Sequence, residues 1–117
     1  MSKLLDQLRS AREFSVEVVA GKPEKRVRFL RPPAAQMPRF RAGVTAELLV
    51  EYAQGWEAIT DGDILPPGIG GDSPALFSPD LLFELLEDNT RWRAACAKGM
   101  VDAISAWLER QELVAKN

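Results

Sequence analysis

The sequence predicts an α+β fold, in which a small N-terminal antiparallel sheet, a β-hairpin, is followed by a mainly helical part of about three helices. Apolar residues alternate with polar ones on both sides of a turn in the segment 14–30. They recur at helical spacing in the later segments 45–55, 79–88 and 90–112. With 117 residues, 46% of them hydrophobic and 27% charged, the chain has the size and composition of one globular domain, 1–117.

The hairpin is predicted because apolar and polar residues alternate along both of its strands. Phe14, Val16 and Val18 share one face of the first strand, and Val27 and Phe29 share one face of the second. These faces form the predicted core side, which leaves the arginines of the second strand in solvent. The preceding segment 2–12 has leucines at helical spacing behind a capping serine. It is either a short helix or a frayed lead-in, because so short a helix is marginal alone.

The three predicted helices have clear ends. Thr45 is expected to cap the helix over 45–55, which Gly55 ends. Ser78, followed by Pro79, is a strong start for the helix over 79–88. Asn89 and its neighbours are expected to end that helix and to cap the next, over 90–112, which is predicted to be the longest element.

Two connections are predicted to lack regular structure. The segment 32–43 contains three prolines, and the residue before each proline is disfavoured in a helix, so we expect a linker or an extended arm. The segment 60–78 is rich in Gly and Pro and is predicted to be a long irregular loop. Loops of this length are usually functional or mobile.

The residue types present argue against an enzyme. The chain has no histidine, which removes the commonest general base, the usual partner of a nucleophile and the commonest metal ligand. Asp61 and Asp63 resemble the opening of a calcium loop, but the later ligand positions are missing. We therefore expect no catalytic residue, no metal and no cofactor. The enzymatic alternative is a metal-dependent hydrolase that uses Asp61, Asp63 and Asp72.

The chain is expected to reside in a reducing cytoplasm. Its single cysteine, Cys96, has no partner for an internal disulfide and lies on the apolar stripe of the last predicted helix, where we expect it in the core. The N-terminus lacks the pattern of a secretory signal, and no apolar run approaches the roughly 20 residues that span a bilayer.

The charges are unevenly distributed. The net charge is −2, which argues against nucleic-acid binding, yet ten of the 15 basic residues lie within the first 41 positions and the acidic residues dominate later. This separation of basic from acidic residues favours head-to-tail association or partners of either charge.

Seven residues are the candidates for partner contact. They are basic or aromatic residues of the hairpin and arm, and apolar residues near the end of the last helix that a small domain has difficulty burying. They are Arg28, Arg31, Arg39, Phe40, Arg41, Trp107 and Leu108.

The middle of the chain resembles the small tail assembly chaperones of tailed bacteriophages and prophages. The resemblance rests on the Trp-containing turn Gly55-Trp56-Glu57, the acidic stretch Asp61-Gly62-Asp63, and the element Phe77-Ser78-Pro79 before the helices. The hairpin and the proline-containing arm also resemble the start of these proteins. The segment 64–75 departs from them, because it is longer than their link.

The resemblance implies a non-enzymatic protein of the host bacterial cytoplasm. It would bind the tape measure protein and the tail tube protein transiently during tail assembly, with no cofactor, and would also have the option of self-association. The alternative is a structural phage component, such as a head-tail connector or a tail-completion subunit, which would remain in the particle.

Overall fold

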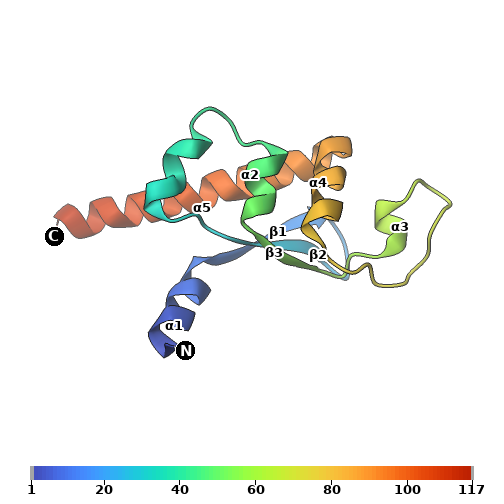
Figure 1. Cartoon of the computed structure of the whole chain (residues 1–117), viewed down its shortest axis with the longest axis horizontal. Helices are drawn as coiled ribbons and strands as arrows, with labels where there is room; N and C mark the ends of the chain where they lie inside the picture. Colours follow the sequence, from blue (N-terminus) through green and yellow to red (C-terminus); the bar gives the residue numbers. More distant parts are fainter. Residues whose placement is uncertain (1, 117) are drawn as a thin grey trace.

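The computed structural model describes residues 2–116 and confirms the α+β class. Its antiparallel sheet has the order β1 (Glu13–Val19), β2 (Lys25–Leu30), β3 (Ala53–Glu57). The helices are α1 (Lys3–Arg12), the 3₁₀ helix η1 (Ala34–Phe40), α2 (Ala46–Glu51), α3 (Asp61–Ile64), α4 (Pro79–Asp88) and α5 (Thr90–Lys116). Helix α5 packs on β1, and α2 and α4 pack beside it (Figure 1). No helix among residues 2–116 is long and apolar enough to cross a membrane.

The two ends of the molecule are formed by different elements. Helix α1 and the C-terminal part of α5 project at one end, and α3 with the long loop lies at the other (Figure 1). The longest dimension of the molecule is 56 Å. Helix α1 passes into β1 with no connecting residue, because Glu13 both ends the helix and begins the strand.

The predicted hairpin is confirmed with its expected facing. Phe14 pairs with Phe29 and Val16 with Val27 across β1 and β2. The rings of Phe14 and Phe29 stack with centroids 5.6 Å apart, and Val16, Val27 and Phe29 are buried. Arg28 is exposed on the opposite face. Local alternation therefore sufficed to find both strands and their core side.

The helix predicted over 45–55 is too long, because its second half is strand β3. Thr45 caps α2 as expected, but the helix ends at Glu51. Gly55 then lies opposite Arg28, and a Cβ at position 55 would stand 2.5 Å from Arg28 Nη2. Trp56 pairs with Val27 on the core side. Pairing with a distant strand overrides the helical spacing here, and local periodicity does not report such pairing.

The extended arm predicted over 32–43 is also wrong, because this segment contains a short helix. Residues 34–40 form η1, and Met37 and Phe40 are buried. In a 3₁₀ helix, residues three apart lie above one another, so Ala34, Met37 and Phe40 line one side of η1. The prolines made a linker plausible, but a short 3₁₀ helix accommodates Pro38 in this position.

The loop predicted over 60–78 is held together by its own backbone. Asp61 N–H donates to the Ser73 carbonyl at 2.9 Å, and Ala75 N–H donates to the Ile59 carbonyl at 2.9 Å. Between these points lies the short α3, which the sequence did not predict. The carboxylate of Asp63 accepts hydrogen bonds from Thr60 N–H at 2.8 Å and from Lys25 Nζ at 2.5 Å. Burial opposes the charge of Asp63, but these hydrogen bonds lower its pKa.

The remaining helices follow the sequence signals. Ser78 caps α4, whose bounds match the prediction, through a hydrogen bond from Leu81 N–H at 3.1 Å. Asn89 accepts hydrogen bonds from the first turn of α5, which extends beyond the predicted residue 112 to Lys116. The lead-in is helix α1, with Ser2 as its cap. The core collects apolar residues from the sheet and from α2, α4 and α5.

Cys96 lies fully buried in this core, as predicted. Burial raises the pKa of its thiol to about 12. Since only the thiolate is nucleophilic, we expect iodoacetamide at pH 8 to leave the folded protein unlabelled and to react once denaturant unfolds it. Mass spectrometry after timed alkylation would measure this. Labelling of the native protein at the rate of a small free thiol would contradict the expected burial.

Candidate functional site

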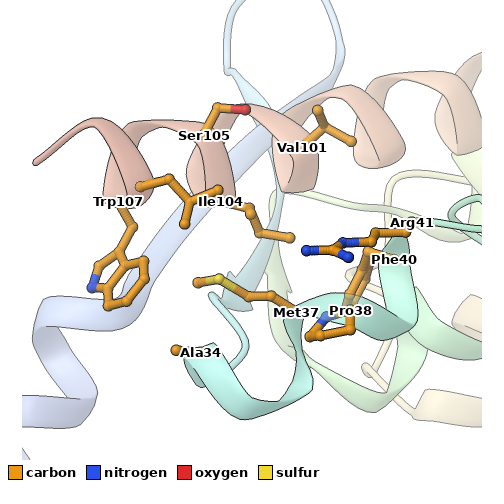
Figure 2. A pocket seen from close by; sticks show the side chains of 10 residues that line it. Ala34, Met37, Pro38, Phe40, Arg41, Val101, Ile104, Ser105 and Trp107 are labelled. Carbon is orange, nitrogen blue, oxygen red and sulfur yellow. The ribbon is translucent and has the colours of Figure 1, made fainter. Parts of the chain in front are cut away.

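An apolar concave surface lies between η1 and α5. Helix η1 contributes four residues and α5 contributes five, with Arg41 at the edge, and together they enclose a groove of about 300 Å³. We call this hollow the η1–α5 groove. Its lining residues are Ala34, Met37, Pro38, Phe40, Arg41, Val101, Ile104, Ser105, Trp107 and Leu108. Figure 2 shows Trp107 directed from α5, and Met37 from η1, towards the space between the two helices.

Periodicity on both walls produces the groove. On η1, the three-residue repeat brings Met37 and Phe40 to the side that faces α5. On α5, Val101, Ile104 and Leu108 follow one another at helical spacing. Val101 and Leu108 are 46% and 49% exposed, so the part of the chain that the structure describes covers the outer part of this wall only partly.

Trp107 also lines a second hollow, whose charged residues are three arginines and Glu13. The guanidinium of Arg31 lies 5.0 Å from the centre of the Trp107 ring, a cation–π contact, and donates a hydrogen bond to the Pro32 carbonyl at 2.8 Å. Arg12 and Arg110 line the same hollow of about 260 Å³. We call Arg12, Arg31 and Arg110 the arginine corner.

The arginine corner concentrates like charges. Partial burial lowers the pKa of Arg31, and repulsion from Arg12 and Arg110 adds to this effect. The Nε atom of Arg12 is buried with no hydrogen-bond partner in the structure. None of the three guanidiniums forms an ion pair with a carboxylate among the described residues. A carboxylate from outside the chain would satisfy donors of this kind.

The structure brings together some of the seven predicted contact residues and separates others. Phe40, Arg41, Trp107 and Leu108 line one groove, and Arg31 lies against Trp107. Arg39 instead forms a two-pronged ion pair with Glu51 at 2.7 and 2.9 Å, which ties η1 to α2. This hydrogen bonding raises the pKa of Arg39 and lowers that of Glu51.

Arg28 is also outside the groove. It lies on the exposed face of the sheet, across Gly55, with its Nε 3.6 Å from Glu57. That position corresponds to a solvated charge on a sheet surface. Arg28 and Arg39 therefore have structural surroundings that account for them without a partner.

Sequence reasoning missed six residues of the groove and two of the arginine corner. Met37 and Ile104 contribute to the groove, and Arg12 and Arg110 complete the arginine corner. The three-residue spacing of Ala34, Met37 and Phe40 was a usable signal for the first wall. The arginine corner had none, because its members come from α1, the end of β2 and α5.

The acidic residues considered for a hydrolase lie in one loop but do not form a metal-binding group among the described residues. Asp63 is occupied by Lys25 and Thr60, and Asp61 and Asp72 do not join it in a ligand cluster. Within residues 2–116, no group of three or more His, Cys, Asp or Glu side chains is placed to hold a metal ion.

Comparison with known proteins yields no relative. No protein-family model, no curated protein and no solved structure matches the chain.

Proposed function

We propose that the chain is a tail assembly chaperone of a bacteriophage or prophage, which transiently binds apolar helical segments of the tape measure protein, and the tail tube protein, in the host cytoplasm. The observation that carries the proposal is the η1–α5 groove, whose outer wall is apolar and half exposed. The resemblance of the central sequence to these chaperones supplies the identity of the partners. The proposed role requires no cofactor.

The groove suits one helix of a partner. Long helices that later assemble with others expose apolar stripes, and side chains spaced along such a stripe fit a groove between two helices. Trp107 and Leu108 are the expected anchors, because large apolar residues at the centre of an interface carry most of the binding energy. The arginine corner would receive a carboxylate of the same partner.

Binding measurements on single variants test the proposal. The full chain is titrated with the tape measure protein of the same phage or prophage. We expect Leu108→Ser and Trp107→Ala each to weaken binding by at least about tenfold, since central anchors contribute this much. Arg110→Glu should weaken binding and flatten its dependence on salt.

A matched leucine controls for general loss of apolar surface. Leu76 is 89% exposed on the long loop and lies outside the groove. Leu76→Ser should bind as the unchanged protein does, and circular dichroism should show that all variants remain folded. Equal binding by Leu108→Ser and the unchanged protein would refute the assigned surface. Retention of the protein in finished particles would favour the connector or tail-completion alternative.

A further inference from the structure

Helix α1 presents an apolar face that is left exposed by the described residues 2–116. Leu4, Leu5 and Leu8 are 73%, 40% and 47% exposed, and α1 has no buried residue. A helix of ten residues is marginal in isolation, so it gains stability chiefly from a packing partner. The exposed charges of α1 are the basic Lys3 and Arg9 and the acidic Asp6, whereas Arg12 belongs to the arginine corner and its Nε is buried.

A groove of the complementary character lies at the opposite end of the molecule. Ile64, Leu81 and Leu85 line a hollow of about 350 Å³ between α3 and α4. Its other lining residues are Glu84, Glu87 and Asp88. A neighbouring hollow shares Ile64 and Asp88 with it and is also lined by Leu65, which is 43% exposed. We call it the α3–α4 groove.

The acidic rim is only partly neutralised within the chain. Glu87 lies 3.6 Å from Arg93, in a pair that is about half exposed. Glu84 and Asp88 form no ion pair among the described residues. The α3–α4 groove thus offers an apolar floor and unpaired carboxylates, which is the reverse of the surface of α1.

We propose that α1 of one copy docks in the α3–α4 groove of a second copy, head to tail. Both α1 and α4 have ten residues, about 15 Å of helix each, so their lengths match. The helix cannot reach the groove of its own chain, because it continues directly into β1 and the two surfaces lie at opposite ends (Figure 1). The leucines contact the floor, and the basic side chains of α1 meet the rim.

Such a contact joins two different surfaces, so an open assembly of any length keeps one free helix α1 at one end and one free groove at the other. The interface is small, and small charged interfaces are weak and sensitive to salt. The contact leaves the η1–α5 groove open and does not depend on the function proposed above. Binding of the tape measure protein and self-association can therefore fail separately.

Complementation between two variants tests the proposal. The first variant carries Leu4→Ser and Leu8→Ser, which remove the apolar face of α1. The second carries Glu84→Lys and Asp88→Lys, which reverse the rim of the groove. Mass is measured by sedimentation equilibrium from about 10 μM to about 1 mM at low salt, the range in which a weak interface shows.

We expect the mass of the unchanged protein to rise with concentration and to fall when salt is added. Each variant alone should remain a monomer. A mixture should form dimers of one copy of each, because the intact α1 of the second variant fits the intact groove of the first. Leu113→Ser with Val114→Ser, on the exposed end of α5, is the matched control and should associate normally.

Three results would overturn the proposal. The unchanged protein could stay monomeric to the highest concentration. The α1 variant or the groove variant could associate as the unchanged protein does, which would place the contact elsewhere. The mixture could remain monomeric although circular dichroism shows both variants folded, in which case the groove accommodates some other basic helix.

Discussion

Phe29→Ala is expected to lower the free energy of unfolding by about 3–5 kcal/mol, the range for truncating a large buried aromatic side chain. Phe29 is fully buried on the central strand and stacks on Phe14. A domain of this size commonly has only about 5–15 kcal/mol of stability in total, so much of the margin would be lost. Urea denaturation followed by circular dichroism would measure the change.

The neighbouring aromatic residue provides the control for this experiment. Phe14 is half-buried on the edge strand β1, so Phe14→Ala should cost clearly less than Phe29→Ala. The double variant should show a coupling of about 0.5–1.5 kcal/mol, as stacked aromatic pairs do. Equal losses for the two single variants would contradict the central position assigned to Phe29.

Gly99→Leu is expected to destabilise the protein by about 3 kcal/mol, at the upper end of the usual effect of overpacking. Gly99 is on α5 where the helix crosses β1, and a Cβ placed there would overlap the side chain of Val16. Helix propensity acts in the opposite direction, because it favours leucine over glycine by about 0.8 kcal/mol. Thermal and urea denaturation would give the sign and the size.

Ala94→Leu is the matched substitution for this test. Ala94 is exposed on the same helix, so an added leucine side chain there should change stability by no more than about 0.5 kcal/mol. A stabilising Gly99→Leu would show that α5 does not approach the sheet closely at this point. Gly99→Ala should also destabilise, by less, because the helix must shift to admit even one methyl group.

Those parts of the fold that depend on neighbouring residues could be predicted from the sequence. The alternation around Val16 and Val27 identified β1 and β2, and Ser78 with Pro79 marked the start of α4. Strand β3 was not predicted, because it forms by pairing with β2, which lies some 25 residues earlier in the chain. Helix η1 escaped because its prolines suggested an arm, whereas burial of Met37 and Phe40 determines its structure.

The residues of the candidate surface could likewise be predicted only in part from the sequence. The sequence pointed to Phe40, Arg41, Trp107 and Leu108, and the structure places these four around one groove. It also pointed to Arg28 and to Arg39, which precedes Phe40 and Arg41 in the chain. Their acidic neighbours Glu57 and Glu51 come from other segments, so only the three-dimensional arrangement shows how these charges are placed.

The direct passage of α1 into β1 has a consequence for the symmetry of any head-to-tail assembly. Without a connecting residue, the direction of α1 follows that of the first strand and hence of the whole sheet. Each added copy is then turned by the same angle relative to the last. If successive turns sum to a full circle without a rise along the axis, a closed ring results, and otherwise a helical filament grows. In such an assembly, the turn between successive copies would depend on the angle between α1 and β1 at Glu13 and on how α1 lies in the neighbouring groove.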